Sequence, residues 1–237
     1  ISANLLTSGV VQKWATIRVP ERLLTYVDVD IVDMWNQLNA GNVVKKKTHT
    51  INEFDNVIQF GMGGLHGAPD KVVNARNVIL LDVASMYPNI IININGLSDA
   101  TKEYKKILDR RLEIKHKDKA ESDALKLILN SVYGNMNNKY SKLNNPRAAY
   151  SVCVYGQIAL YELSKRLSTT CKIININTDG VAFTTSSEEY KEIWKEWEKD
   201  FNLELEADTF DVFIQKDVNN YIGIKNGGRM IPGSEGV

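Results

Sequence analysis

The sequence predicts an α+β fold, because strand patterns and long helical patterns follow one another along the chain. Residues 78–83 form a short apolar run that includes one acid near its end, which is typical of a buried strand. Residues 172–185 divide into two strands around Asp179-Gly180, a strong hairpin signal. Residues 101–138 and 148–167 show the apolar spacing of helices.

Composition and charge exclude several classes of protein. The 237 residues are 43% hydrophobic and 24% charged, as in water-soluble globular domains and unlike disordered, collagen-like or membrane proteins. Lys and Arg number 29, and Asp and Glu also number 29, so a net charge of zero gives no overall attraction for nucleic acid or membranes. A nucleic-acid partner would therefore have to bind a local patch.

Cysteine content and hydropathy favour a cytoplasmic protein with no membrane partner. Cys153 and Cys171 lie far apart and lack the paired spacing of a zinc site or a disulfide framework, which fits a reducing compartment. No stretch approaches the ~18 apolar residues of a membrane span, and the first residues lack a signal-peptide pattern.

The first 76 residues carry few chemical signals. Residues 32–38 have a helical pattern and residues 57–60 a strand pattern. The glycines of residues 61–67 permit close approach of the backbone to a bulky partner, although a tight loop between strands explains them equally well. A metal-binding cluster could be formed by Asp28, Asp30 and Asp33. This is the weaker interpretation, because alternation in a strand that leads into a helix also explains these three acids.

Charge is unevenly distributed along the chain. Residues 102–147 hold twelve Lys and Arg against six Asp and Glu, whereas residues 188–211 hold ten Asp and Glu against three Lys. The basic segment is predicted to form two antiparallel helices with a break near residues 117–122. The acidic segment includes a predicted amphipathic helix, residues 190–201, packed by Trp194 and Trp197. A solvated helix face is the simplest explanation of each charged run taken alone.

Two carboxylates are predicted at the ends of strands. Asp82 lies at the end of the strand of residues 78–83, which Pro88 prevents from continuing, and Asp179 lies at the tip of the hairpin. Singly, each has a simpler role, as a cap or as a turn residue. If their strands are neighbours, the two carboxylates face the basic helices and form a site for Mg²⁺ and a polyphosphate.

The second basic helix carries a pattern suited to a triphosphate. Lys126, Asn130 and Tyr133 are spaced i, i+4 and i+7, so they share one helix face. The positive charge of Lys126 on this face can contact phosphates. The opposite side of this helix is expected to hold Leu127, Ile128 and Val132.

Residues beside this face extend the same hypothesis. Gly134 leaves room for a ring, so the end of the face can lie against a base pair. Arg111 and Lys115 on the preceding helix are four residues apart and could clamp the same phosphates.

Three motifs in this order resemble those of the family B DNA polymerases, particularly the bacteriophage members. Residues 82–88, Asp-Val-Ala-Ser-Met-Tyr-Pro, resemble the first motif, Asp-x-x-Ser-Leu-Tyr-Pro. Residues 126–134 resemble the second, Lys-x-x-x-Asn-Ser-x-Tyr-Gly, with every defining residue present. Asn177-Thr178-Asp179 resembles the third, usually Asp-Thr-Asp. The first two motifs together are specific, and the resemblance covers residues 61–221.

The resemblance implies a polymerase palm, an antiparallel sheet backed by helices, with a helical fingers insertion. Residues 1–76 would lead into the palm and include a glycine-rich template-side loop, and residues 77–98 would be the first part of the palm. Residues 99–147 would be the fingers and residues 148–237 the second part of the palm, with no thumb. The chain lacks exonuclease motifs and begins with Ile1, so it is expected to belong to a longer polypeptide with exonuclease and thumb modules, in the host cytoplasm if phage-encoded.

The resemblance also implies an activity, the template-directed addition of deoxynucleotides to a primer 3′ end. Asp82, Asp179 and the backbone carbonyl of Val83 would hold two Mg²⁺ ions, for which Mn²⁺ could substitute. The catalytic residues would be Asp82, Asp179 and Lys126, and the partners would be primer–template DNA and deoxynucleoside triphosphates.

The other site residues are assigned by the same resemblance. The N–H groups of residues 84–86 would face phosphate oxygens, Tyr87 would exclude a ribose 2′-hydroxyl, and His66 is interpreted as structural. The nucleotide would be bound by Ser85, Met86, Tyr87, Arg111, Lys115, Lys126 and Asn130. The DNA would be contacted by Tyr133, Gly134, Gly63, Gly64 and Tyr221.

Two departures leave alternatives open. Asn177 stands where the family has its first aspartate, and Asn219-Asn220-Tyr221 lacks the lysine of the family's Lys-x-Tyr. A non-catalytic nucleic-acid-binding remnant is one alternative, because an amide is a weaker metal ligand than a carboxylate. A two-metal nuclease is another, although it would have no use for a triphosphate clamp at residues 126–134.

Overall fold

The computed structural model describes residues 48–61, 63–225 and 228–233. The helix expected at residues 32–38 and the possible cluster of Asp28, Asp30 and Asp33 lie outside these residues. The chain divides into two compact units. The described part of the first, called the sheet unit, lies within residues 48–84 and 156–233, and that of the second, the helical unit, is residues 85–155.

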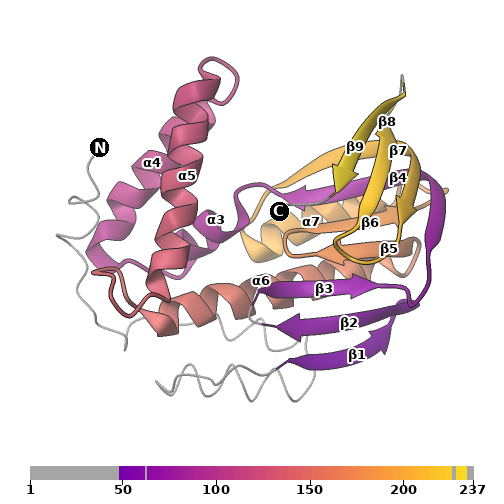
Figure 1. Cartoon of the computed structure of the whole chain (residues 1–237), viewed down its shortest axis with the longest axis horizontal. Coiled ribbons are helices and arrows are strands. Elements are labelled where there is room, and N and C mark those ends of the chain that lie inside the picture. The colour runs from indigo at the N-terminus through magenta and orange to yellow at the C-terminus, as the bar shows by residue number, and fades with distance from the viewer. Residues whose placement is uncertain (1–47, 62, 226–227, 234–237) are drawn as a thin grey trace. The chain divides into compact units, whose positions relative to one another are not determined.

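The sheet unit contains a nine-stranded sheet in which every pair of neighbouring strands is antiparallel (Figure 1). The strands lie in the order β1-β2-β3-β5-β6-β4-β7-β8-β9. They are β1 (His49–Glu53), β2 (Asn56–Gly61), β3 (Gly64–Ala68), β4 (Val73–Val83), β5 (Lys172–Asn177), β6 (Gly180–Thr184), β7 (Leu205–Gln215), β8 (Tyr221–Lys225) and β9 (Arg229–Gly233).

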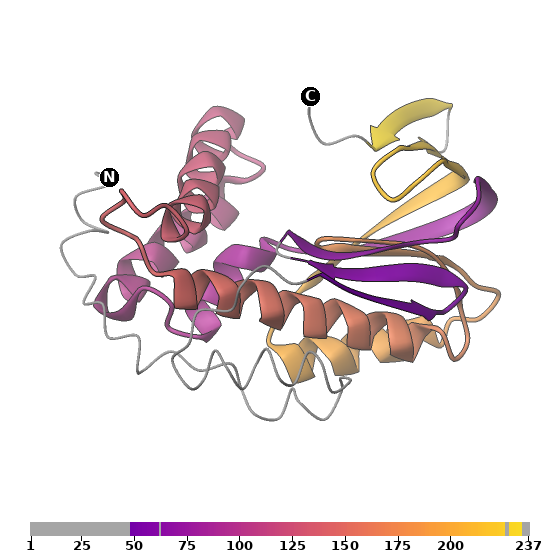
Figure 2. The same ribbon diagram turned by 60° about the horizontal axis from the view of Figure 1, so that its bottom comes forward.

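Two helices cover one face of this sheet (Figure 2): α7 (Tyr190–Phe201) and, within the sheet unit, residues 156–167 of α6 (Pro146–Leu167). The indole N–H of Trp197 donates to the carbonyl of Ala159 at 2.7 Å, and the buried Trp197 ring stacks on Phe201. Packing by tryptophan is therefore confirmed at Trp197, whereas Trp194 is only partly buried. An antiparallel sheet backed by helices is the predicted α+β fold, which is confirmed.

Strand β4 is central to the sheet because it pairs with β6 on one side and β7 on the other. These three strands, together with β5, contribute side chains to an apolar cluster. The cluster contains Val78, Ile174, Ala182, Phe210 and Phe213. Since β4 is held on both sides, the residues at its end are fixed by two ladders of hydrogen bonds.

The helical unit is built around an antiparallel pair, α4 (Thr101–Ile114) and α5 (Lys119–Met136) (Figure 1). They are preceded by α3 (Met86–Asn93) and the short helix η3 (Ser98–Ala100), and followed by the first turns of α6. The buried hydroxyl of Tyr104 on α4 donates to the carbonyl of Leu129 on α5 at 2.9 Å. The predicted pair of helices is confirmed. No helix in the described part of the chain is long and apolar enough to cross a membrane.

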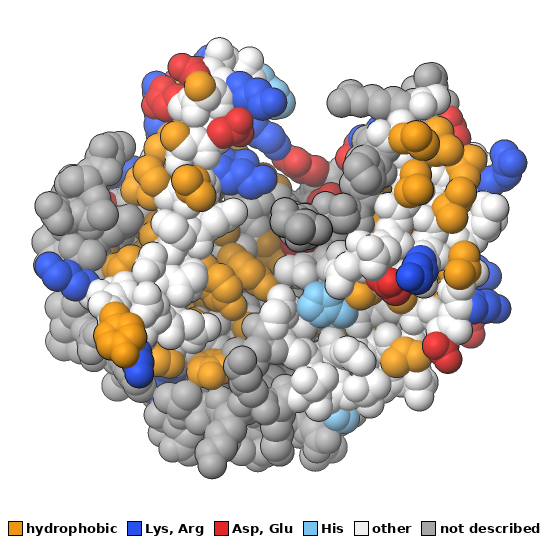
Figure 3. Space-filling view, viewed as in Figure 1, with side chains coloured by type: hydrophobic (Ala, Val, Ile, Leu, Met, Phe, Trp, Pro, Cys, Tyr) orange, Lys and Arg blue, Asp and Glu red, His pale blue; other side chains and the backbone are white. Residues whose placement is uncertain are grey.

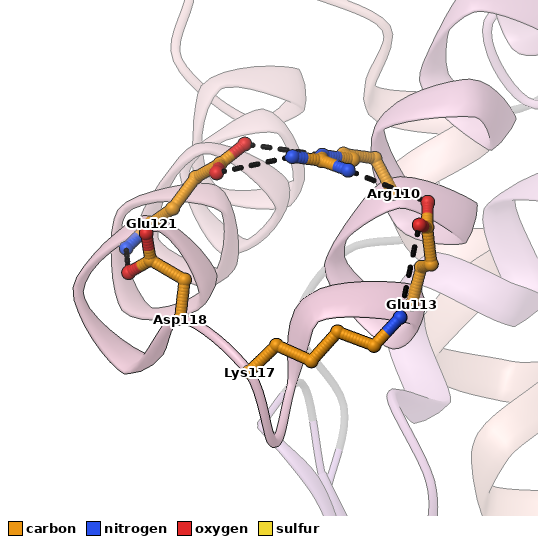
Figure 4. Close-up of polar contacts among 5 residues, drawn as sticks. All are labelled: Arg110, Glu113, Lys117, Asp118 and Glu121. Carbon is orange, nitrogen blue, oxygen red and sulfur yellow. Dashed lines mark hydrogen bonds and ion pairs between the residues drawn. The ribbon is translucent and has the colours of Figure 1, made fainter.

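The break between α4 and α5 ends at a helix cap. The side chain of Asp118 accepts from the backbone N–H of Glu121 at 3.0 Å, which satisfies one of the unpaired donors at the start of α5 (Figure 4). Residues 115–118 therefore separate the helices, close to the expected break at residues 117–122.

Several basic side chains of the helical pair are neutralised by neighbouring acids. Arg110 contacts Glu121 at 3.2 Å and Glu113 at 3.4 Å, and Lys117 lies 4.0 Å from Glu113 (Figure 4). Figure 3 shows the resulting mixture of basic and acidic side chains over the upper part of the pair. Similar ion pairs join Lys105 to Asp109 and Lys106 to Glu103. A solvated, charge-balanced helix face explains these residues without a ligand.

Candidate active site

The sheet unit brings Asp82 and Asp179 together at one end of neighbouring strands. Strand register pairs Asp82 with Gly180, and the N–H of Val83 donates to the carbonyl of Asp179 at 2.7 Å. A Cβ atom built on Gly180 would lie 2.1 Å from Oδ1 of Asp82. The Asp82 carboxylate therefore lies against Gly180, the residue that follows Asp179.

The turn that carries Asp179 is anchored to strand β3. Thr178 adopts a left-handed backbone conformation with φ of 51°, and its N–H donates to the carbonyl of Leu65 at 2.9 Å. Its hydroxyl lies 3.2 Å from Nε2 of His66. Asp179 itself is exposed at the tip. Burial lowers the pKa of His66, so this ring pairs with Thr178 as a neutral group at neutral pH.

A third acid lies opposite Asp82 in the sheet and was missed by the sequence reasoning. Glu206 on β7 is the register partner of Asp82, and residues directly opposite in an antiparallel pair place their side chains on the same face. Like charges in this position repel one another unless a cation compensates them. Glu206 was hidden because it belongs to the acidic run of residues 188–211, and only the pairing of β4 with β7 reveals its neighbour.

The donor set at this end of the sheet suits a hard divalent cation. Carboxylate and carbonyl oxygens are the ligands that Mg²⁺ prefers, and Asp82, Asp179 and the backbone of Val83 carry oxygens of these kinds. No three His, Cys, Asp or Glu side chains within the described residues form a group that could hold a metal ion. Glu206 is therefore a charged neighbour of Asp82, and ligands beyond the two carboxylates would have to come from the backbone, water or a substrate.

In the helical unit, Arg111 binds the residue that starts α3. Ser85 is the N-cap of α3 and has a left-handed conformation with φ of 48°, and its hydroxyl accepts from Nη1 of Arg111 at 2.7 Å. The Nε–H of Arg111 is buried and has no hydrogen-bond partner among the described residues. A buried donor of this kind requires a partner such as water or a ligand oxygen.

Tyr87 and Tyr133 are in ring contact within the same unit. Their centroids lie 4.5 Å apart with the planes tilted by 40°, so the first motif meets the end of the second. Burial raises the pKa of Tyr133, and nearby Cys153 and Tyr150 add to the shift. Both phenol rings are partly buried and keep some exposed surface for another ring or a sugar.

The other residues of the second motif lie along an exposed stripe of α5. The side chains of Lys126 and Asn130 are exposed and form no ion pair or hydrogen bond with another described residue. A Cβ built on Gly134 would meet nothing within 4 Å, so nothing in the described chain requires a glycine there. This stripe is therefore open to a binding partner.

One expectation about α5 was wrong. Leu127 was expected on the packing side of the helix, but its side chain is 73% exposed, while Ile128 is partly buried and Val132 is buried. The packing stripe follows the spacing i, i+4, i+7 and i+11 from Leu125, which places Leu127 about 200° away around the helix. Its members are Leu125, Leu129, Val132 and Met136.

Among the residues expected to bind the nucleotide, the structure corrects the role of the Ala84 N–H and limits that of Met86. The N–H of Ala84 donates to the carbonyl of Glu204 at 2.8 Å, so it does not face a phosphate as expected. The side chain of Met86 is buried, which leaves only its backbone for a nucleotide. Lys115 is partly buried at the end of α4.

The residues expected to contact DNA from the sheet unit lie in two separate parts of the sheet, near the β2–β3 turn and at the start of β8. Gly63 and Gly64 lie at the β2–β3 turn, where the amide of Gln157 donates to the carbonyl of Gly64 at 3.2 Å. The strands on either side pair directly, with Gly61 opposite Gly64. Tyr221 begins β8, and its ring stacks on Phe213 with centroids 4.6 Å apart.

Comparison with solved structures identifies the fold. The chain is similar to the family B DNA polymerase from the hyperthermophilic archaeon Pyrobaculum calidifontis, with a TM-score of 0.56 and 18% sequence identity over 69% of this chain. The chain spans 28% of the length of that polymerase. No family model and no curated protein matches the sequence. At this identity the similarity shows a shared fold, one with a polymerase palm-like antiparallel sheet backed by helices.

Proposed function

We propose that this chain is the palm and fingers part of a template-directed DNA polymerase, which adds deoxynucleotides to a primer 3′ end by two-metal phosphoryl transfer. The observation that carries the proposal is the convergence of Asp82 with the Asp179–Gly180 turn at the ends of β4 and β6. The two acids come from motifs nearly a hundred residues apart in the sequence. The fold shared with a family B polymerase supports the same conclusion.

The carboxylate pair would provide the metal site. Asp82, Asp179 and the carbonyl of Val83 would hold two Mg²⁺ ions, or Mn²⁺ in their place, which would activate the primer hydroxyl and neutralise the triphosphate when bound. Glu206 would increase the negative potential beside the pair and so favour cation binding.

The helical unit would supply the nucleotide-binding groups. Arg111 would donate its Nε–H to a phosphate oxygen, since that donor is buried without a partner among the described residues. Lys126 and Lys115 would add positive charge, and Asn130 would support the same face. Tyr87 would lie against the sugar.

The DNA contacts are proposed from both units. Tyr133 and Gly134 would pack on the nascent base pair, since Gly134 has open space beside it. Gly63 and Gly64 would approach the template strand, and Tyr221 would approach the primer. Bases would be selected by the template, because such phosphate and stacking contacts carry no sequence information.

The decisive experiment is primer extension by Asp82→Asn in the intact protein with Mg²⁺ and all four deoxynucleotides. We expect extension to fall by at least about a thousandfold, because an amide binds the metal poorly, while the Kd for primer–template DNA changes by no more than a few fold. Asp123→Asn is the matched control, since Asp123 is exposed on α5 and forms no ion pair with a described residue.

Three results would contradict the proposal. An active Asp82→Asn variant would remove the carboxylate pair from the chemistry. DNA binding by the unaltered protein without any extension would favour a non-catalytic remnant. Cleavage of DNA in the absence of nucleotides, lost in Asp82→Asn, would favour a two-metal nuclease.

A further inference from the structure

We propose that Asn177 is a positioning residue whose amide ties the turn carrying Asp179 to the β7–β8 loop (residues 216–220), and that this chain requires an amide at residue 177. The role in catalysis rests on the proposed function, whereas the tie itself is a property of the fold. Asn177 is thus an adaptation of this chain to its own loop, and an aspartate would weaken the site.

Asn177 uses both ends of its amide. Its Nδ2 donates to the carbonyl of Val218 at 3.4 Å, and its Oδ1 accepts from the hydroxyl of Thr178 at 3.1 Å. Thr178 in turn lies 3.2 Å from Nε2 of His66 on β3. The residue before the Asp179 turn is therefore bonded to the β7–β8 loop on one side and to the turn itself on the other.

A buried amide network supports the same carbonyl. Nδ2 of Asn175, two residues earlier on β5, donates to Val218 at 3.1 Å and to Oε1 of Gln215 at 2.9 Å. Gln215 donates from Nε2 to the carbonyl of Ile174 at 3.4 Å. Asn175 and Gln215 are only 4% and 0% exposed, so their polar atoms depend on these partners. Two amides from β5 thus converge on one carbonyl of the β7–β8 loop.

The β7–β8 loop is held in place by hydrogen bonds within it. The carboxylate of Asp217 accepts from the backbone N–H groups of Asn219 and Asn220 at 3.1 and 3.0 Å. These contacts lower the pKa of Asp217, with the side chain of Asn220 the largest cause. The loop leads directly into Tyr221, the residue assigned to the primer. A shift of Val218 would therefore disturb the Asp179 turn and the primer side together.

A carboxylate at residue 177 could not replace this amide. It has no hydrogen to donate, so it would face the Val218 carbonyl oxygen with like polarity. It would also add a negative charge two residues from Asp179 and next to strand β6, which pairs with the strand of Asp82. An amide avoids both penalties, which gives a physical reason for asparagine in the third motif.

The test compares Asn177→Asp and Asn177→Ala with Asn52→Asp in the intact protein. Asn52 is exposed on β1, so its substitution matches the charge change without touching the network. Amide hydrogen exchange is measured at residues 178–180 and 216–220 without metal or DNA. We expect exchange there to become about five- to tenfold faster in both Asn177 variants, with no change in Asn52→Asp.

Primer extension with saturating Mg²⁺ gives the second readout. We expect Asn177→Asp to lose about tenfold or more in rate, whereas a metal ligand in the family's manner would raise it. Unchanged exchange in Asn177→Asp, or faster extension by that variant, would overturn the proposal. The exchange measurement needs no catalysis, so it decides the tie even if the unaltered protein extends no primer, an outcome that would refute only the proposed function.

Discussion

The carboxylate of Asp82 lies where a side chain at residue 180 would have to lie. A Cβ at Gly180 would be 2.1 Å from Oδ1 of Asp82 and 3.3 Å from its Cγ, and the first of these is a distance that real Cβ atoms do not show. Gly180 is therefore set by space, because the strands of the two motifs are adjacent in the sheet. The dipeptide Asp179-Gly180 forms the turn, and its glycine also leaves the space that the Asp82 carboxylate occupies.

Gly180→Ala should damage the site more than the fold. The added methyl must displace Asp82, and overpacking of this kind costs about 1–3 kcal/mol in the free energy of unfolding. Misplacement of a reacting group by about 1 Å can cost about a hundredfold in rate. We expect primer extension to fall by about that factor or more, measured beside the denaturation midpoint. Unimpaired extension would mean that the position of Asp82 is not critical.

Gly134→Ala should have the opposite effect on stability. Gly134 lies in α5 with nothing within 4 Å of the position that an added methyl group would take, and alanine is favoured over glycine in helices by about 1 kcal/mol. We expect the free energy of unfolding to rise by about 0.5–1 kcal/mol while the Kd for primer–template DNA increases severalfold. A variant that is more stable and binds DNA as tightly as before would remove Gly134 from the DNA contact.

Most helices and strands could be predicted from the sequence, but the order of the strands in the sheet could not. The strands at residues 78–83 and 172–185 and the helices at residues 101–138, 148–167 and 190–201 were predictable, because their patterns are local. The order of the strands was not, because β3 lies beside β5 and β4 lies between β6 and β7 through pairings between distant parts of the chain.

The candidate site follows the same division. Asp82 and Asp179 were found by their motifs, whereas Glu206 becomes visible only through the register of β4 with β7. The hydrogen bond of Asn177 to Val218 was equally hidden, since the two residues are 41 positions apart. Non-local contacts of this kind leave no periodic trace in the sequence.

Two contacts that join α4 to α5 should differ in their contribution to stability. Tyr104→Phe removes a buried hydrogen bond to the carbonyl of Leu129, and we expect a loss of about 1 kcal/mol in the free energy of unfolding. Glu121→Gln removes the exposed partner of Arg110 (Figure 4), and we expect no measurable loss at physiological salt. Denaturant titrations of both variants test this contrast, and a larger effect of Glu121→Gln would contradict it.

His66 should make the stability depend on pH. Burial lowers the pKa of His66 below its ordinary value of 6.5, so the unfolded chain binds this proton more readily than the folded chain. The contribution of neutral His66 to the free energy of unfolding is complete above about pH 6.5 and is lost as the pH falls below that value. As the pH is lowered from about 7.5 to 5.5 without metal, we expect the denaturation midpoint to decrease. The decrease should be smaller in His66→Gln. Equal slopes in the two proteins would show that His66 does not titrate in this way.

Arg111→Lys should separate nucleotide binding from DNA binding. The guanidinium holds the hydroxyl of Ser85 through Nη1 and presents a buried Nε–H that has no partner among the described residues. A lysine keeps the charge but loses the fork of donors, and a hydrogen bond to a charged group contributes about 1.5–3 kcal/mol. The KM for deoxynucleotides should therefore rise about ten- to a hundredfold, with the Kd for primer–template DNA unchanged within a few fold.

Arg110→Lys is the matched control for this measurement. Arg110 neighbours Arg111 in sequence but lies exposed and pairs with Glu113 and Glu121, so the same substitution alters only two ion pairs on the surface. A KM that rises equally in both variants would indicate a general effect of arginine content on α4. A KM that rises in neither would mean that the buried Nε–H of Arg111 is satisfied by water and has no role in binding the triphosphate.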